Sequence, residues 1–346
     1  MSPLTRVQRF QGCFPDAPAF RFRQAEAALF QPGATGWGSV SVFPKAMRDS
    51  MEAKIPWMSV ALHRMAESKD KETFKAVLST EDNLLFETVL MGNAREQWTV
   101  CVSSQVGCAM RCVFCATGAM GLKRSLSSDE IVDQLRFWQS FLRASPALEA
   151  RISNIVFMGM GEPLANVSSV KRAIRTWVDH TDIGPTHITV STVGVLPVMD
   201  QLLEDKGWPP VRIAISLHSA DQAEREKIVP STVPHFLDKL ADWCRRYRQI
   251  LGNRRHHLTF EYTLISGVND SGEQAETLAR FIERCGKPKL NVIPLNIVAG
   301  KPFTASEQER IDRFKQVMLR QGIDVMQRRT MGQDIHAACG QLVASE

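Results

Sequence analysis

Six short apolar runs, each separated from the next by a segment long enough for a helix, constrain the fold of this chain more than any other feature. The runs are WTVCVSSQ, NIVFMGM, HITVSTV, VRIAISLH, LTFEYTLI and KLNVIPLN. Strands this apolar are typical of a parallel sheet covered by helices on both faces. A helix is predicted from Ser127 to Phe141, because a Ser-Ser-Asp-Glu capping pattern precedes apolar residues at helical spacing.

This alternation predicts an α/β fold, a partial (βα)6 barrel of the TIM type whose site lies at the C-terminal ends of the strands. Residues 1 to 90 break the alternation, and RFRQAEAALFQ and FPKAMRDSMEAKI predict short helices there. We therefore expect a small helical accessory domain over residues 1–90 and a catalytic barrel over residues 91–346.

Composition limits the possible functions. With 346 residues, 44% of them hydrophobic, the chain can bury a large core. The N-terminal MSPLTRVQRFQGCFPDAP lacks the apolar stretch of a signal peptide, and no run approaches the length of a membrane span. We expect a cytoplasmic protein, in which eight cysteines indicate metal binding or chemistry rather than a disulfide scaffold.

Three cysteines follow the first apolar run: Cys108, Cys112 and Cys115. At this spacing one loop can wrap three thiolates around one inorganic centre and leave a ligand position open. Iron–sulfur clusters and catalytic zinc sites both use such an arrangement. The spacing alone leaves a second interpretation, a structural zinc completed by a distant His or Cys.

Two further stretches contain candidate functional residues. Small residues end the second run in GMGEP, where the backbone can approach a ligand and Glu162 can accept from an ammonium group. A tight turn explains such a stretch equally well. Cys339, in AACGQL, lies more than two hundred residues along the sequence from the three clustered cysteines. A lone cysteine among alanines is ordinarily a small buried hydrophobic residue.

These motifs resemble those of the RlmN/Cfr group of radical S-adenosylmethionine (SAM) RNA methyltransferases, from RFRQAEAALF to DIHAACGQL. The resemblance implies two cofactors, a 4Fe–4S cluster and SAM. The cluster ligands that it implies are Cys108, Cys112 and Cys115. The SAM-binding residues that it implies are Gly161, Glu162, Ser191, Ser216, Leu217, His218 and Asn296. The catalytic residues that it implies are Glu87, Cys101 and Cys339, whereas Cys13, Cys244 and Cys285 match no motif.

The implied mechanism explains the separate cysteines. An adenine C2 or C8 carbon is not nucleophilic enough to take a methyl group from SAM, but a thiolate is. In the family's mechanism Cys339 takes that methyl group, and a 5′-deoxyadenosyl radical from a second SAM activates it for addition to the base. Glu87 then accepts a proton, and Cys101 attacks the sulfur of Cys339, so that a transient disulfide forms and the base departs.

The resemblance also implies partners: an adenosine of 23S ribosomal RNA, a tRNA adenosine, and an electron donor of the flavodoxin or ferredoxin type, with the enzyme itself a monomer. The target base must be unpaired or extruded to reach a barrel interior. We expect the accessory domain to recognise RNA. The net charge of +5 permits this, and each basic cluster either contacts RNA or is ordinary solvated surface. These clusters are Lys123–Arg124, Arg245–Arg248, Arg254–His257 and Arg328–Arg329.

Regioselectivity follows less directly from the residues. GLKRSLSSDEI is closer to the C8 branch, and Met331-Gly332-Gln333-Asp334 stands where the C2 branch commonly has Arg-Gly-Asp-Asp. We predict C2, the commoner housekeeping activity, with C8 as the alternative. Two other classes stay open: a zinc-stabilised RNA-binding protein without catalysis, and a radical SAM enzyme acting on a small molecule or peptide, against which AACGQL argues.

Overall fold

A parallel sheet forms the centre of the computed structural model, which describes residues 3–93, 95–148, 151–251 and 258–343. The main sheet has ten strands in the order β1-β2-β3-β4-β7-β8-β9-β10-β11-β12, and every pairing from β4 to β12 is parallel. The parallel strands are β4 (Trp98–Cys101), β7 (Ile152–Phe157), β8 (Ile188–Thr192), β9 (Arg212–Ser216), β10 (Leu258–Leu264), β11 (Lys289–Pro294) and β12 (Val325–Gln327). The α/β barrel and its six predicted strands are confirmed.

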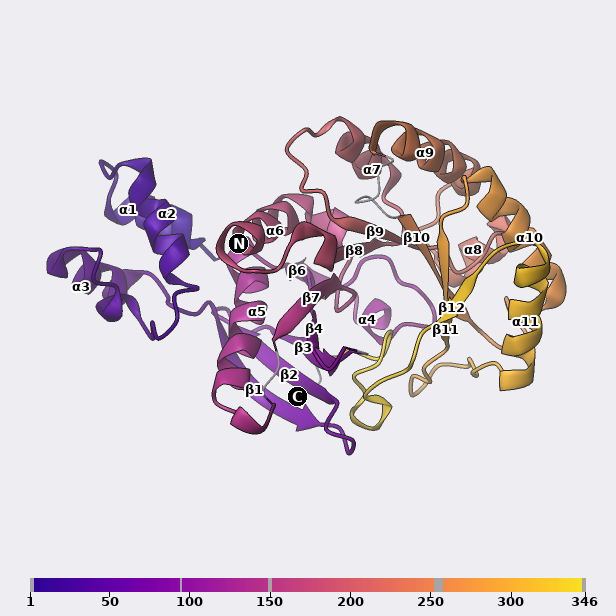
Figure 1. Ribbon diagram of the computed structural model, residues 1–346, viewed down its shortest axis with the longest axis horizontal. Coiled ribbons are helices and arrows are strands. Elements are labelled where there is room, and N and C mark those ends of the chain that lie inside the picture. Colours follow the sequence, from indigo (N-terminus) through magenta and orange to yellow (C-terminus); the bar gives the residue numbers. More distant parts are fainter. Residues whose placement is uncertain (1–2, 94, 149–150, 252–257, 344–346) are drawn as a thin grey trace.

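Helices surround this curved sheet on its outer side (Figure 1). They are α5 (Ser128–Arg143), α6 (Val167–His180), α7 (Leu196–Glu204), α8 (Gln222–Ile228), α9 (Phe236–Leu251), α10 (Gly272–Arg284) and α11 (Gln308–Arg320). The predicted capping box of α5 is present, with Ser127 and Glu130 each accepting from the other's backbone N–H. Ile131, Leu135 and Trp138 form its buried face. No described helix is long and apolar enough to cross a membrane.

The N-terminal helices form a small body of their own beside the barrel (Figure 1). They are α1 (Arg6–Cys13), α2 (Ala19–Ala28) and α3 (Lys45–Lys54). Their core is separate from the barrel's, and Phe10, Trp37 and Met51 are buried in it. The helices predicted for the first ninety residues therefore exist, but they end at Lys54.

The sequence analysis does not anticipate three antiparallel strands: β1 (Val60–Glu67), β2 (Thr73–Thr80) and β3 (Leu85–Gly92). They extend the barrel sheet through the β3–β4 pair. Both faces of β2 and β3 are largely buried, so the apolar alternation of a half-exposed strand is missing. A functional division at residue 90 stays a prediction.

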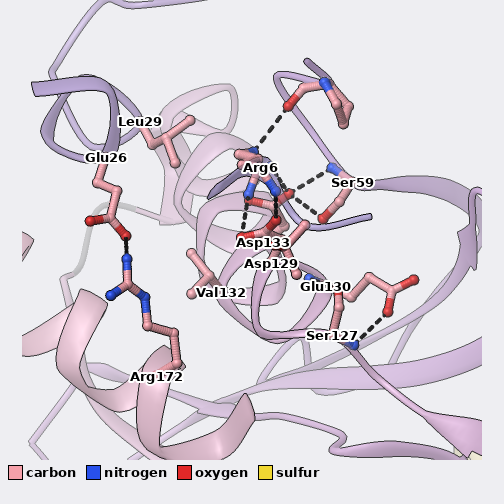
Figure 2. A network of polar contacts seen from close by, with 12 residues as sticks. Arg6, Glu26, Leu29, Ser59, Ser127, Asp129, Glu130, Val132, Asp133 and Arg172 are labelled. Carbon is pink, nitrogen blue, oxygen red and sulfur yellow. Dashed lines mark hydrogen bonds and ion pairs between the residues drawn. The ribbon is translucent and has the colours of Figure 1, made fainter. Parts of the chain in front are cut away.

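Arg6 fastens the helical body to the barrel (Figure 2). Its guanidinium is buried and donates to the carboxylate of Asp133 on α5, and Nη2 also donates to the carbonyl of Trp57 over 3.0 Å. Ser59 N and Oγ each donate to Asp133 Oδ2 over 2.6 Å. Burial alone would raise the pKa of Asp133, but Arg6 and Arg136 lower that pKa to about 2.

Removing this buried pair should loosen the attachment of the helical body. We expect Arg6→Ala to lower the free energy of unfolding by about 3 kcal/mol, because Asp133 loses a partner inside the protein. Arg9→Ala is the matched control on the same helix, since Arg9 pairs with the exposed Glu81. Its expected cost is below about 1 kcal/mol. Urea denaturation measures both values, and equal losses would contradict the anchoring role.

Candidate active site

The loop after β4 carries the three clustered cysteines. It runs through β5 (Gln105–Gly107) to α4 (Ala116–Ala119) and returns in β6 (Leu122–Ser125), antiparallel to β5. Cys108 N donates to the Gly121 carbonyl over 3.0 Å. Gly107 has φ +77°, and a Cβ there would lie 1.8 Å from that same carbonyl oxygen, so only glycine fits. The turn thereby brings all three thiols to the wall of one cavity.

This cavity has a volume of about 1040 Å³, its open mouth included, and Cys108, Cys112 and Cys115 line it together. Burial raises the pKa of Cys108 to about 11 and also raises that of Cys112, and the nearby Cys115 adds to both shifts. Thiolate ligands of an iron–sulfur cluster surround a volume, because they bind different irons. The three thiols fit such a cluster. Among the described residues, no three His, Cys, Asp or Glu side chains gather closely enough for a single metal ion.

The strand end after β7 forms a second wall of this cavity. Gly161 lines the cavity with φ +96°, where a Cβ would lie 2.5 Å from Gln105 Cβ. Glu162 is buried, and its two carboxylate oxygens accept from Leu164 N and Val193 N, each over 2.9 Å. Burial raises the pKa of Glu162. The strand end is thus both a tight turn and part of the cavity wall.

The ends of β8 and β9 contribute three polar side chains. Ser191 and Ser216 line the cavity with their hydroxyl oxygens 3.2 Å apart. His218 has φ +58°, and its Nδ1 accepts from Thr263 N over 3.1 Å, so its proton is on Nε2. Burial, together with Arg225, lowers the pKa of His218 to about 3 and keeps the ring neutral. Leu217 is fully buried, and its side chain is absent from the cavity wall.

Cys339 reaches the site from the far end of the chain. Asn296, which follows β11 and lines the cavity, donates through Nδ2 to the Cys339 carbonyl over 2.9 Å. Cys339 itself is exposed and lines the same cavity. A second cavity, of about 910 Å³ with its open mouth included, is lined by both Cys339 and Cys101. Cys339 thus stands in the wall shared by the two cavities.

Cys101 and the three clustered cysteines line different cavities. Cys101 lines the second cavity, and the cluster cysteines line the first. Burial, with a contribution from Cys339, raises the pKa of Cys101 to about 12. Both residues are free thiols. The disulfide that the resemblance implies is therefore absent from this structure, although the structure brings the two cysteines to one cavity.

Glu87 lies on β3 outside both cavities. Its Oε1 is 3.1 Å from Lys75 Nζ, and its Oε2 accepts from Val343 N over 2.9 Å. Burial raises the pKa of Glu87, and the Lys75 ammonium opposes that shift. Val343 N therefore occupies one oxygen of the carboxylate that is expected to accept the substrate's proton.

Arg225, on α8, is a residue of the site that the sequence analysis missed. Its Nε donates to the Leu217 carbonyl over 3.0 Å and its Nη2 to the Val193 carbonyl over 2.6 Å, so it joins the ends of β8 and β9. The guanidinium lies 3.7 Å from the centre of the Phe236 ring. Burial lowers the pKa of Arg225 to about 9. An arginine in QAEREKI reads as a solvated residue, so the sequence carries no signal for this role.

Two of the basic clusters, left open in the sequence between RNA contact and solvated surface, form ion pairs within the protein. Arg124 pairs with Asp82 and Glu130. In the second cluster Arg246 lies 2.8 Å from Asp200, and Arg245 pairs with Asp242. Arg254–His257 lies outside the described residues.

In the last basic cluster, Arg328–Arg329, one residue lies in the site and the other on the surface. Arg328 lines both cavities, with Nη1 at 3.4 Å from Glu261 Oε2. Arg329 pairs with Glu72 at 2.8 Å. Arg328 therefore belongs to the site, whereas Arg329 remains a surface residue.

Position 161, in the turn that follows β7, should not tolerate a side chain. We expect Gly161→Ala to lower the free energy of unfolding by about 2 kcal/mol, because a left-handed backbone and the Gln105 contact both oppose a Cβ. Gly184→Ala is the control, since φ there is −67° and no atom lies within 4 Å of the added Cβ. Thermal unfolding of the cofactor-free chains compares the two. A neutral Gly161→Ala would show that the turn has room to relax.

The sequence and the fold of this chain are similar to those of known proteins. Residues 102–282 match the model of the "Radical SAM superfamily". A protein of Anaeromyxobacter named "Dual-specificity RNA methyltransferase RlmN" is 38% identical, over 99% of this chain and 89% of its own length. A Synechococcus protein named "Probable dual-specificity RNA methyltransferase RlmN" is 40% identical, over 94% of this chain and 91% of its own. A solved radical SAM methyltransferase from Sphaerobacter thermophilus is 38% identical with a TM-score of 0.88, covering 99% of this chain and 98% of its own.

Proposed function

The chain belongs to the RlmN family of radical SAM RNA methyltransferases, and on this premise we propose that it methylates an adenosine of 23S ribosomal RNA at C2 through a methyl group carried on Cys339. Membership of this family sets aside the non-catalytic zinc protein and the small-molecule or peptide enzyme. One observation supports the proposal most, the position of Cys339 in the wall between a cavity lined by cluster cysteines and a cavity lined by Cys101. C8 methylation is the alternative outcome.

Two cofactors act in this enzyme, a 4Fe–4S cluster and SAM. Cys108, Cys112 and Cys115 are the proposed cluster ligands, and together the two cofactors supply the radical chemistry that activates an unreactive C–H bond. The proposed SAM-binding residues are Gly161, Glu162, Ser191, Ser216, His218 and Asn296, all of which line the first cavity. Leu217 can contribute only through its backbone, because its side chain is buried behind the wall.

The two cavities suit the release of the product. Cys101 attacks the sulfur of Cys339, a sulfur–sulfur bond forms and the carbon–sulfur bond breaks. The electron pair of the broken bond goes to the departing carbon, which takes up a proton and becomes the methyl group. Displacement at sulfur is in line, so the nucleophile and the departing carbon lie on opposite sides of it. The base therefore belongs in the first cavity, with Cys101 behind Cys339 in the second.

Glu87 is the proposed proton acceptor, and this role requires that Val343 release its carboxylate. A base must reach the proton that it removes, and Val343 N now donates to Glu87 Oε2. Glu87 can act only after the C-terminal residues release it. Its raised pKa then favours proton uptake once the substrate is bound.

RNA is the substrate class of this enzyme family, and its finer identity is part of the proposal. The relatives' names state dual specificity, which supports a tRNA adenosine as a second substrate. The base must be extruded or unpaired to reach the first cavity. We further propose that residues 1–90 recognise RNA, that a flavodoxin- or ferredoxin-type protein donates the electrons, and that the enzyme is a monomer.

Mass spectrometry of cellular RNA tests the function. We expect 2-methyladenosine in 23S ribosomal RNA to disappear on deletion of the gene and to return with the wild-type chain, but not with Cys339→Ala, which lacks the carrier thiol. Cys13→Ala, a change in the helical body far from the site, should restore it fully. Loss of 8-methyladenosine instead would establish the C8 alternative, and an unchanged methyladenosine content would refute the function.

Cys101→Ala should stop the reaction after the new carbon–carbon bond has formed. We expect RNA to remain joined to Cys339 and to appear on a denaturing gel as a slow band that nuclease collapses. The double variant Cys101→Ala with Cys339→Ala should lack the band, because the tether's sulfur is gone. Normal turnover by Cys101→Ala, without an adduct, would mean that another group releases the product.

A further inference from the structure

Residues 332–343, which we term the C-terminal strap, cross the barrel and carry Cys339. Beyond Cys339 the strap is fixed to the cluster loop, since Ala116 N donates to the Gly340 carbonyl over 2.7 Å and Thr117 Oγ1 to the Leu342 carbonyl over 2.6 Å. At Cys339 itself, Asn296 Nδ2 donates to the backbone carbonyl over 2.9 Å. The side chain of Asn296 is therefore the direct support of the carrier residue.

The Asn296 amide has a second partner within the strap. Its Oδ1 accepts from Gln333 Nε2 over 3.1 Å, and Asn296 is only 4% exposed. A backbone carbonyl is an acceptor alone, so the Cys339 carbonyl requires the NH2 end of Asn296 to face it. Gln333 must then present its own NH2 group to Asn296 Oδ1. Cys339 thus sets the orientation of both amides.

We propose that Gln333 is a positioning residue, which holds the Asn296 amide in the one orientation that supports the Cys339 backbone between the two cavities. The inference rests on the proposed role of Cys339 as methyl carrier. A rotation of the Asn296 amide by half a turn would place its oxygen against the Cys339 carbonyl and its NH2 group against Gln333 Nε2. Both hydrogen bonds would be lost at once.

The hydrogen-bonding chemistry of the side chain at position 333 decides which way the Asn296 amide faces. A carboxylate only accepts hydrogen bonds. An acidic side chain at 333 would draw the Asn296 NH2 group toward itself and away from the Cys339 carbonyl. Gln333 has the donor that the observed arrangement needs, and its isostere Glu has the opposite preference.

Two substitutions at 333 separate positioning from packing. Gln333→Ala removes the donor but leaves the Asn296 amide free to keep its orientation. Gln333→Glu keeps the shape and favours the wrong orientation. If Gln333 acts by positioning, the strap should be most ordered in the wild type, less ordered in Gln333→Ala and least ordered in Gln333→Glu. If Gln333 acts by packing, Gln333→Glu should resemble the wild type and Gln333→Ala should have the least ordered strap.

Hydrogen exchange of the strap in the full chain without cofactors is the first measurement. We expect exchange at the Ala338 and Gln341 amides to rise about fivefold in Gln333→Glu, the effect of losing roughly one hydrogen bond, and less in Gln333→Ala. Gln201→Glu, which adds the same charge on the exposed face of α7, should leave the strap unchanged. Equal exchange in wild type and Gln333→Glu would overturn the proposal.

Methylation of Cys339 in the reconstituted enzyme is the second measurement. We expect Gln333→Glu to lower kcat for this step by a larger factor than it raises the KM for SAM, because Asn296 is one of several proposed SAM contacts but directly supports the backbone of the carrier residue. A higher KM with an unchanged kcat would overturn the positioning role. Failure of the proposed function looks different: RNA methylation would persist in Cys339→Ala, whereas the order of strap exchange would stay as expected.

Discussion

The shared direction of the parallel strands from β4 to β12 decides where chemistry can occur in this protein. It brings strand ends that are distant in the sequence to one edge, so that the cysteine loop after β4 meets Glu162 after β7 and Asn296 after β11 around one cavity. A shift of one residue in any strand would turn its inward side chains outward. The site therefore depends on the sheet register before it depends on any single polar residue.

Buried polar groups around the first cavity are fixed mostly by backbone partners. Glu162 accepts from two amides, His218 accepts from Thr263 N, and Arg225 donates to the carbonyls that end β8 and β9. Each such group would cost free energy if it were buried without a partner. Because the partners belong to the sheet and its loops, the fold itself holds these polar side chains in place.

Local sequence patterns predicted the features of the fold that depend on residues close together in the chain. Apolar runs and a capping box gave the six strands and α5, and thiol spacing gave the cluster loop. The roles of Arg225 and Gln333 depend on contacts with segments far along the chain, which no local pattern records. Glu87 is a similar case, because its carboxylate accepts from Val343 N, more than two hundred residues later, and no local pattern records that contact.

Hydrogen bonds link the position of Cys339 to the shape of the cysteine loop after β4. Ala116 and Thr117 directly follow Cys115, a proposed cluster ligand, and both donate to carbonyls of the strap just beyond Cys339. On its other side Cys339 is held by Asn296 at the end of β11. The strap thus joins two separate walls of the barrel, so a change that displaces the cysteine loop after β4 is expected to displace the thiol of Cys339, the proposed methyl carrier, as well.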